Sequence, residues 1–366
     1  MEQKLLFSIL KNFSVEGSPT DAVPYGNGHI NDTYLVTTDK KRYVLQRINT
    51  SVFKDPAGLM ENITRVTDHL RKKLADRGED FTRGTLHPVK TVDGATCYQG
   101  QCGTFRVYDY IEDSVCYDAV ENPEQFYTCA LAFGDFQADL ADFDASVLTE
   151  TIPDFHNTPA RFAQLMRAAR ADIVWRLAEV GYELNFAMER EAFCSVLEDA
   201  AKDGKLPLRV THNDTKLNNI LFDKTSGKPL AVVDLDTVMP GYAVCDFGDS
   251  IRFGASTAPE DETDLSKVHF DISLFRQYAR GFLRGTAGHL TETEMNLLPD
   301  ASVLMTLECG MRFLADYLAG DVYFKIHKPT HNLDRARNQF RLVEEMEAAL
   351  PAMREIIKQE QENYQI

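Results

Sequence analysis

The stretch that most constrains this chain is Val210-Thr211-His212-Asn213-Asp214-Thr215-Lys216-Leu217-Asn218-Asn219, a polar loop followed at once by the apolar run Ile220-Leu221-Phe222. A polar turn then leads to a second apolar segment, Leu230-Ala231-Val232-Val233, which ends at Asp234. Two short apolar runs around a polar turn predict a β-hairpin. Such a hairpin returns the chain to its starting point, so we expect Asp234 to lie beside Asn219.

The spacing of His212, Asp214 and Asn219 is that of a kinase catalytic loop, in which the Asp faces a substrate hydroxyl and the Asn faces a metal ion. Asn219 and Asp234 offer two oxygen ligands, which suit Mg²⁺ because this ion keeps water and phosphate in its other positions. We predict that Asp214 is the general base and that Asn219 and Asp234 bind Mg²⁺. The alternative is that Asn219 and Asp234 are ordinary turn residues.

The triplet Asp246-Phe247-Gly248 spells the metal-binding triplet of protein kinases, but it follows a turn and not the return strand of the hairpin. We therefore assign the metal to Asp234. For Asp246 we predict a buried carboxylate that accepts backbone N–H groups near the catalytic loop. His212 is predicted to be structural, with its ring tying the loop to neighbouring backbone, and not to act as a base.

Length and charge narrow the class of protein. The chain has 366 residues, which favours two lobes, predicted at 1–112 (nucleotide-binding) and 113–366 (mainly helical, catalytic and substrate-binding). The net charge of 39 − 56 = −17 disfavours binding to nucleic acid or to an anionic membrane. Seven scattered cysteines, no signal peptide and no membrane-spanning apolar run indicate a cytoplasmic protein.

The N-terminal part predicts a small antiparallel sheet. Residues 23–48 read as three strands, with Gly26 and Gly28 in the first loop, where backbone N–H groups could approach phosphates; an ordinary hairpin turn explains the glycines equally well. On the third strand, the position that kinases fill with a phosphate-contacting Lys carries Gln46. We expect Gln46 to make a neutral hydrogen bond to phosphate. The alternative is a bulge that lets Arg47 serve.

Later segments complete the predicted architecture. Residues 105–111 read as the last strand of the small lobe, and the backbone of Asp109 and Ile111 is predicted to contact adenine; an ordinary edge strand is the alternative. The runs 87–90 and 95–98 are predicted to pair as a hairpin. Helical spacing covers, among others, 158–182, 187–203, 271–285, 291–319 and 332–363. The predicted fold class is α+β, with a small antiparallel β-sheet lobe and a larger, mainly helical lobe.

These motifs resemble the aminoglycoside phosphotransferase and choline kinase group, and within it the N-acetylhexosamine 1-kinases. The likeness is carried by residues 25–31, 208–221, 234–237, 246–254 and 308–318. It implies a two-lobed protein-kinase-like fold, ATP and Mg²⁺ as cofactors, and phosphorylation of the anomeric hydroxyl of N-acetylglucosamine or N-acetylgalactosamine. The resemblance also accounts for Gln46, since that family carries Gln at this strand position.

The resemblance further implies that His29, Arg312 and Tyr323 bind the sugar together with Asp214. Read from the residues alone, Arg312 is a helix-surface ion pair, Tyr323 a core aromatic and His29 a loop residue. The expected partners are a small sugar and ATP, with the protein as a monomer.

Two other functions stay open. The first is a kinase of the same fold that acts on another small alcohol, such as choline or an aminoglycoside. The second is a pseudokinase that binds nucleotide without turnover, an idea motivated by Gln46 and opposed by the intact set of Asp214, Asn219 and Asp234.

Overall fold

The computed structural model describes residues 1–26, 30–117, 120 and 122–364. The chain forms two compact units, which we call the sheet unit and the helical unit. The sheet unit comprises Met1–Cys116, Asp142–Pro153 and Asn219–Pro240, and the helical unit comprises Tyr117–Ala141, Asp154–Asn218 and Gly241–Ile366. The boundary between Asn218 and Asn219 falls within the catalytic-loop motif, so each unit carries part of it.

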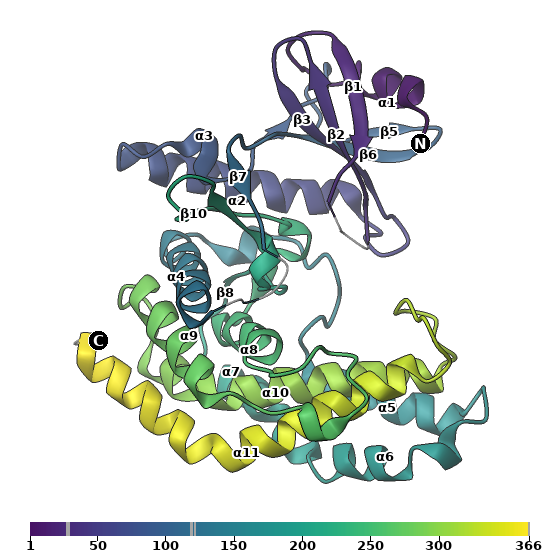
Figure 1. Ribbon diagram of the computed structural model, residues 1–366, viewed down its shortest axis with the longest axis vertical. Coiled ribbons are helices and arrows are strands. Elements are labelled where there is room, and N and C mark those ends of the chain that lie inside the picture. Colours follow the sequence, from purple (N-terminus) through teal and green to yellow (C-terminus); the bar gives the residue numbers. More distant parts are fainter. Residues whose placement is uncertain (27–29, 118–119, 121, 365–366) are drawn as a thin grey trace. The chain divides into compact units, whose positions relative to one another are not determined.

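The sheet unit is built on an antiparallel sheet (Figure 1). Its strands follow the order β1-β2-β3-β6-β4, and β5 also pairs with β6. The strands are β1 (Pro19–Pro24), β2 (Asp32–Thr38), β3 (Arg42–Ile48), β4 (Pro88–Val89), β5 (Tyr98–Gly100) and β6 (Gly103–Asp109). The three N-terminal strands predicted from residues 23–48 are confirmed.

The two faces of this sheet have different chemistry. Helix α1 (Gln3–Leu10) packs against one face, where side chains such as Leu45 and Val107 form an apolar core. Because side chains alternate along a strand, the residues next to them, Gln46 and Arg106, point to the opposite face. That face meets helix α2 (Pro56–Asp76), which contributes Met60.

Helix α2 begins where the sequence indicates. The Asp55 carboxylate accepts a hydrogen bond from the backbone N–H of Gly58 at 3.0 Å, and Pro56 occupies the first helical position. Both features favour a helix start, because the carboxylate satisfies an otherwise unpaired N–H and proline needs no hydrogen bond there.

The predicted hairpin after the catalytic loop is present. Strands β9 (Ile220–Asp223) and β10 (Pro229–Val232) pair antiparallel, and β7 (Ser114–Val115) extends them to a three-stranded sheet. The short helix α3 (Phe81–Gly84) belongs to the same unit.

The hairpin predicted between residues 87–90 and 95–98 is wrong. The two segments form β4 and β5, and each pairs with β6 instead of with the other. A hydrogen bond from the Thr91 N–H to the Ala95 carbonyl closes the turn between them. Both short segments pair with the longer strand β6 and so join a larger sheet. An isolated two-stranded hairpin of this length would be only marginally stable.

The helical unit consists mostly of α-helices (Figure 1). They are α4 (Pro123–Asp139), α5 (Thr158–Ala171), α6 (Gly181–Met188), α7 (Val196–Lys202), α8 (Ala243–Gly254), α9 (Ile272–Gly285), α10 (Glu292–Leu318) and α11 (His331–Tyr364). A short strand, β8 (Arg209–Thr211), precedes the catalytic loop, and β11 (Met239–Gly241), of which only Gly241 belongs to this unit, precedes α8.

Two predicted helices are shorter than the sequence pattern indicates. Residues 158–182 form a helix only as far as Ala171, because Asp172 and Trp175 adopt left-handed backbone conformations with φ of 37° and 62°. Residues 187–203 are divided between the end of α6, a 3₁₀ segment at Glu191–Ser195 and α7. The predicted helices at 271–285, 291–319 and 332–363 are confirmed as α9, α10 and α11.

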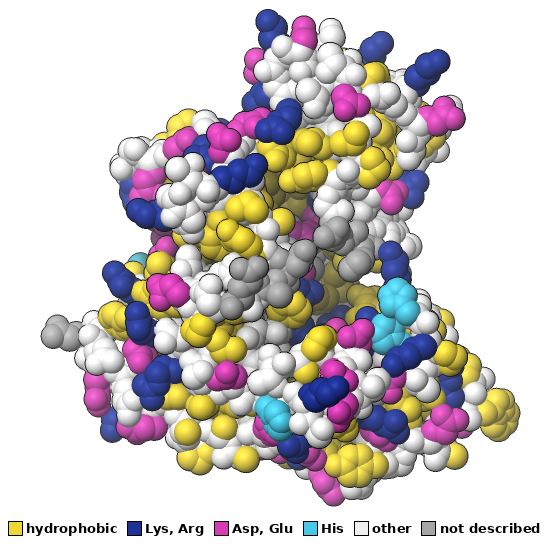
Figure 2. Space-filling model, in the orientation of Figure 1, with side chains coloured by type: hydrophobic (Ala, Val, Ile, Leu, Met, Phe, Trp, Pro, Cys, Tyr) yellow, Lys and Arg dark blue, Asp and Glu magenta, His cyan; other side chains and the backbone are white. Residues whose placement is uncertain are grey.

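The predicted α+β class, with an antiparallel-sheet part and a larger helical part, is confirmed. Acidic and basic side chains are interspersed over the face shown in Figure 2. Within the described ranges, no helix combines the length and apolar character needed to cross a bilayer.

Helices α4 and α9 pack unusually closely because glycines meet at their crossing. A Cβ built on Gly134 would lie 2.6 Å from the carbonyl oxygen of Phe282 and 2.8 Å from the Cα of Gly285. Both neighbours are backbone atoms, so they cannot rotate away as a side chain would. The two helices approach at a distance that only glycine permits.

We expect Gly134→Ala to destabilise the protein by about 1–3 kcal/mol, because the added methyl group forces the two helices apart. Gly181→Ala is the matched control, since a Cβ there meets nothing within 4 Å. Thermal unfolding followed by circular dichroism should show a lower midpoint for Gly134→Ala and an unchanged or higher one for Gly181→Ala. Equal midpoints for the two variants would contradict the close-packing argument.

Candidate functional site

Asn219 and Asp234 lie at the same end of the β9–β10 hairpin, within the sheet unit. Ile220 is paired with Val232, and the N–H of Val233 donates to the carbonyl oxygen of Asn219 at 2.9 Å. The chain then reaches Asp234, which adopts a left-handed conformation with φ of 59°. Asn and Asp tolerate this conformation better than most residues, so the hairpin end bends without a glycine.

The donors at this hairpin end fit Mg²⁺. They comprise one amide oxygen, from Asn219, and one carboxylate, from Asp234. Mg²⁺ is commonly held by one or two carboxylates together with water and substrate phosphates, and not by a complete protein cage. Asn219 is buried and Asp234 is exposed, so the pair presents a partly open ligand set, as an ion that also binds phosphate requires.

In the helical unit, Asp246 fixes the catalytic loop. This carboxylate is 2% exposed and accepts hydrogen bonds from the backbone N–H of His212 at 2.9 Å and of Asn213 at 2.7 Å. A third donor is the side-chain amide of Gln137, at 2.9 Å. Burial raises the pKa of Asp246, although these donors and the nearby His212 oppose the rise. The predicted structural role of Asp246 is confirmed.

His212 is also structural, as predicted. Its side chain is fully buried, and its Nδ1 accepts a hydrogen bond from the backbone N–H of Asp214 at 3.3 Å. The rings of Phe133 and Phe136 contact the imidazole edge to face. The ring is therefore held in place on the inner side of the loop.

Asp214, the predicted base, is paired with a cation from its own loop. Lys216 Nζ lies 2.7 Å from Asp214 Oδ1, and each side chain is about one third exposed (32%). Burial alone lowers the pKa of Lys216, but Asp214 and Asp249 outweigh this effect and the pKa is raised. The Lys216 ammonium therefore stays charged and remains paired with the carboxylate of the predicted base.

A buried histidine connects the catalytic loop to α10. His156 Nδ1 lies 2.9 Å from Glu308 Oε1, and His156 Nε2 lies 3.4 Å from the carbonyl oxygen of Asn213. The other oxygen of Glu308 accepts the hydroxyl of Thr158 at 2.6 Å. With Glu308 ionised, both ring nitrogens face acceptors, so the ring satisfies both only as the protonated imidazolium.

The electrostatics agree with that geometry. Burial alone lowers the pKa of His156, but the Glu308 carboxylate outweighs it, with a smaller contribution from Asp249, and the pKa is raised above 6.5. Arg312 acts in the opposite direction. For Glu308, burial raises the pKa, but His156 and Arg312 outweigh burial and the pKa is lowered.

The structure brings Arg312 and Tyr323 together. The Arg312 guanidinium lies 6.0 Å from the centre of the Tyr323 ring and 5.2 Å from that of Phe155. Asp316 fixes the loop, because its carboxylate accepts the backbone N–H groups of Val322, Tyr323 and Phe324 at 2.8–3.0 Å. Tyr323 remains 58% exposed, so it is not the core aromatic that its sequence alone suggests. His29 lies outside the described residues.

Asp109 and Ile111, the residues predicted to contact adenine, lie in the sheet unit at the end of β6 and just after it. The N–H of Asp109 donates to the carbonyl of His87 at 3.1 Å, and the carbonyl of Ile111 accepts the Ser114 hydroxyl at 2.6 Å. Asp109 is also paired with Tyr43 of β3 in the strand register.

The glycine loop is described only in part. Gly26 has φ of 75°, a conformation that favours glycine, and open space where a Cβ would stand. Gly28 lies outside the described residues. Tyr25, just before the loop, contacts Tyr110 edge to face with ring centres 5.9 Å apart.

Gln46 and Arg47 leave β3 in opposite directions. Arg47 pairs with Asp32 at 3.0 Å, and both side chains are about half exposed. Gln46 donates from Nε2 to the Thr33 hydroxyl at 2.9 Å and accepts at Oε1 from Arg106 Nε at 2.9 Å. The strand pairing between β2 and β3 continues in register through both residues, so no bulge turns Arg47 inward.

Arg106 and Asp236 were not among the residues predicted from the sequence, yet they form a buried ion pair. Arg106 Nη1 lies 2.5 Å from Asp236 Oδ1, with side chains 1% and 6% exposed. Asn31 donates to Asp236 Oδ2 at 2.6 Å. One signal was visible in the sequence: an arginine interrupts the apolar strand Phe105-Arg106-Val107-Tyr108. A buried strand carries such a residue only when it has a partner.

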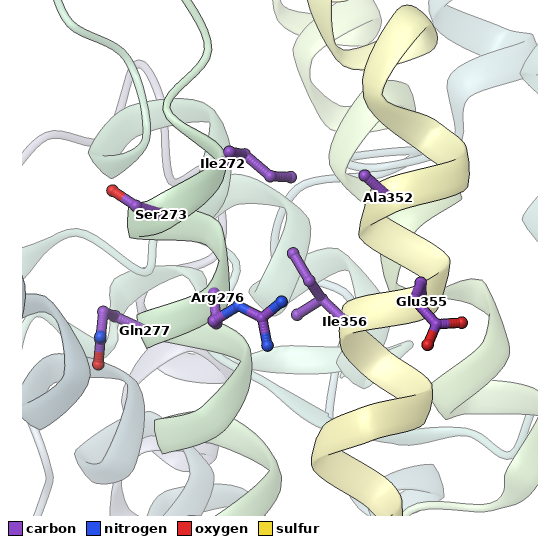
Figure 3. Close-up of a pocket in the computed structure, with 7 residues that line it drawn as sticks. All are labelled: Ile272, Ser273, Arg276, Gln277, Ala352, Glu355 and Ile356. Carbon is purple, nitrogen blue, oxygen red and sulfur yellow. The ribbon is translucent and has the colours of Figure 1, made fainter.

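A separate surface hollow of about 360 Å³ lies between α9 and α11. Figure 3 shows Arg276 reaching across it toward α11, with Ile272 and Ile356 on either side. Arg276 donates to Gln359 at 3.0 Å. None of the predicted site residues that the structure describes lines this hollow.

The His156–Glu308 contact predicts a pH-dependent stability. Because the pKa of His156 is higher in the folded protein than its unfolded value of about 6.5, protonated His156 stabilises the fold fully at pH values below 6.5. This stabilisation is lost as the pH rises through the folded-state pKa. We expect His156→Gln to lower stability by about 2 kcal/mol at pH 6, and the deficit to shrink toward pH 9. The measurement is urea unfolding of both proteins across this range.

The exposed His289 provides a control, and His289→Gln should follow the wild-type curve at every pH. A deficit for His156→Gln that stays constant from pH 6 to 9 would mean that His156 is not protonated in the fold.

The comparisons with known proteins agree with this architecture. An aminoglycoside phosphotransferase from Alicyclobacillus acidocaldarius is 14% identical with a TM-score of 0.59, and the match covers 96% of each chain. A spectinomycin phosphotransferase solved with ADP and spectinomycin is 13% identical with a TM-score of 0.56, over 96% of this chain and 99% of that one. A choline kinase from Cryptosporidium parvum is 13% identical with a TM-score of 0.55, over 95% and 96%.

At these identities the structures show a shared fold. The sequence match is more specific: the model of the phosphotransferase enzyme family, known as APH, matches residues 21–286. This range includes the glycine loop, the catalytic loop, the hairpin and Asp246. The chain therefore belongs to the APH phosphotransferase enzyme family.

Proposed function

We propose that this protein is an ATP-dependent kinase of a small alcohol, and that the alcohol is the anomeric hydroxyl of N-acetylglucosamine or N-acetylgalactosamine. The main support is the conformation of the loop around Asp214, which the buried Asp246 carboxylate fixes by hydrogen bonds to the loop backbone. Family membership supports phosphoryl transfer. The spectinomycin phosphotransferase that shares the fold binds ADP, which supports ATP as the donor.

In this proposal the nucleotide binds the sheet unit. The Asp109 carbonyl and the Ile111 N–H contact adenine, and the loop of Gly26 and Gly28 approaches the phosphates with its backbone. Gln46 hydrogen-bonds to phosphate. Asn219 and Asp234 hold Mg²⁺, which when bound would neutralise charge on the transferring phosphates.

Asp214 accepts the proton of the sugar 1-hydroxyl. The sugar oxygen then bonds to the γ-phosphorus, the bond from that phosphorus to the β–γ bridging oxygen breaks, and ADP leaves. A hemiacetal hydroxyl is more acidic than an ordinary alcohol, so a carboxylate is a sufficient base. The products are the sugar 1-phosphate and ADP.

The sugar assignment rests on His29, Arg312 and Tyr323. Arg312 and Tyr323 are neighbours, as a shared binding surface requires, and His29 keeps its proposed role from the resemblance. Arg161 adds a second arginine: burial and the nearby Arg312 lower the pKa of Arg161, and Glu308 and Asp154 oppose this. Both arginines can donate to sugar hydroxyl and acetamide oxygens.

The deciding experiment measures ADP release with Mg-ATP against N-acetylglucosamine, N-acetylgalactosamine, glucose, galactose, choline and kanamycin. We expect turnover with the two N-acetyl sugars, and phosphorus NMR should place the new phosphate on the anomeric carbon. Turnover confined to choline or kanamycin would leave the kinase assignment intact and remove the sugar assignment with the roles of His29, Arg312 and Tyr323.

Asp214→Asn tests the base. The variant keeps the size of the side chain but cannot accept the proton, so kcat should fall by about 10²- to 10⁴-fold. Asp203→Asn, at an exposed position in the same unit, is the control and should keep wild-type turnover. If Asp214→Asn retained more than a tenth of the wild-type kcat, Asp214 would not be the base. Wild-type turnover itself excludes a pseudokinase.

A further inference from the structure

The third strand of this chain has no basic residue at the position where kinases carry one. In kinases a lysine on the third strand contacts the nucleotide phosphates and pairs with a glutamate of the helix that follows. Here that strand carries Gln46. Helix α2, which the structure describes throughout, buries no carboxylate: its inward residues are Gly58, Leu59, Met60, Asn62, Ile63, Val66, Thr67 and Leu70. Both members of the usual ion pair are absent from their usual elements.

An equivalent pair is present on two other elements of the sheet unit. Gln46 of β3 and Arg106 of β6 are directly opposite each other in the strand register. Arg106 Nε donates to Gln46 Oε1 at 2.9 Å, so the guanidinium lies next to the position that a strand-three lysine would occupy. The carboxylate partner of Arg106 is Asp236, at 2.5 Å. Asp236 lies two residues after the proposed metal ligand Asp234.

The surroundings fix the guanidinium in one orientation. It lies 5.2 Å from the centre of the Tyr108 ring, and Nη1 lies 3.9 Å from the sulfur of Met60 on α2. Asp236 is itself held by Asn31 at 2.6 Å, and the side-chain oxygen of Asn31 accepts the backbone N–H of Asn49 at 2.9 Å. Among the residues that the structure describes, the contacts of Arg106 use Nε and Nη1, and none of them uses Nη2.

The charges point toward the proposed nucleotide site. Burial alone lowers the pKa of Arg106, but Asp236 outweighs it, with a contribution from Asp234, and the pKa is raised. Arg106 is therefore a permanent cation whose ion-pair partner is Asp236. Because the Asp236 carboxylate already balances this cation, Mg²⁺ bound at Asp234 would add positive charge that a phosphate chain could then balance.

We propose that Arg106 replaces the strand-three lysine and binds the phosphate chain of the nucleotide, with Asp236 as the residue that positions it. This inference rests on the proposed function, because it takes ATP as the ligand. It assigns to Gln46 the further task of orienting Arg106 by accepting its Nε–H. A guanidinium with an unused amino group is well suited to phosphate, since arginine forms paired hydrogen bonds with phosphate oxygens.

The test compares binding of ATP, ADP and adenosine by calorimetry. Arg106→Gln alone leaves the buried Asp236 without its cation and can prevent folding, so the main variant is Arg106→Gln/Asp236→Asn, which removes both charges. We expect this variant to bind ATP and ADP at least about tenfold more weakly than the wild type. Its affinity for adenosine, which has no phosphate, should stay within about twofold.

A second variant moves the cation to the other strand. Gln46→Lys/Arg106→Gln places a lysine directly opposite the original arginine and keeps the charge of Asp236 balanced. Most of the ADP affinity should return, because the cation again lies beside the same carboxylate. The control is Arg47→Gln, which removes an exposed cation from the same strand and should bind all three ligands as the wild type does.

The outcomes separate this inference from the proposed function. If the wild type binds and turns over ATP but Arg106→Gln/Asp236→Asn loses no selectivity for ADP over adenosine, Arg106 is only structural. The same conclusion follows if the relocated lysine binds ADP no better than the charge-free variant. If the wild type binds neither ATP nor ADP, the proposed function fails and the inference fails with it.

Discussion

The catalytic loop depends on one buried carboxylate. Asp246 is almost inaccessible to solvent, and it accepts the N–H groups of two successive loop residues together with the amide of Gln137. Removing a charged group from water is costly unless hydrogen bonds replace the lost hydration. The loop supplies those bonds only in one conformation. Other conformations would leave the buried Asp246 carboxylate without hydrogen bonds, so they are higher in free energy. Asp214 is then presented on a rigid backbone.

The sheet unit uses the same principle with a different partner. Asp236 is buried, and its oxygens contact Arg106 and Asn31. In both units, therefore, an aspartate outside the proposed reacting groups organises the residues that carry the chemistry. Buried ion pairs contribute little net stability compared with apolar packing, but breaking one is expensive. Their value here is the fixed geometry of the groups around them.

The sequence predicts some of this architecture and misses other parts for identifiable reasons. The spacing of residues within short segments was sufficient to predict the β9–β10 hairpin and the structural role of Asp246. The supposed hairpin at residues 87–98 failed because a more distant strand, β6, competes for both segments. Such competition cannot be read from a short window.

Arg106 was missed for a related reason. Its significance depends on the register between β3 and β6, which places it opposite Gln46, and on a hairpin much later in the chain that supplies Asp236. Sequence spacing describes neighbours along the chain and says little about partners across a sheet. The resemblance directed attention to Arg312 and Tyr323, which the structure places side by side. Without the resemblance, the sequence had favoured a helix-surface ion pair for Arg312 and a core position for Tyr323, with no relation between them.

Two backbone positions restrict how this chain can vary in evolution. Asn213 and Asp234 both adopt left-handed conformations, with φ of 65° and 59°, and each lies next to or at a proposed functional group. Only glycine, asparagine and aspartate adopt this region at little cost. Position 213 can therefore drift among those three residues while β-branched and bulky residues remain excluded, even though its side chain has no proposed chemical task. Sequence constancy there would record the shape of the peptide chain and not the chemistry of the side chain.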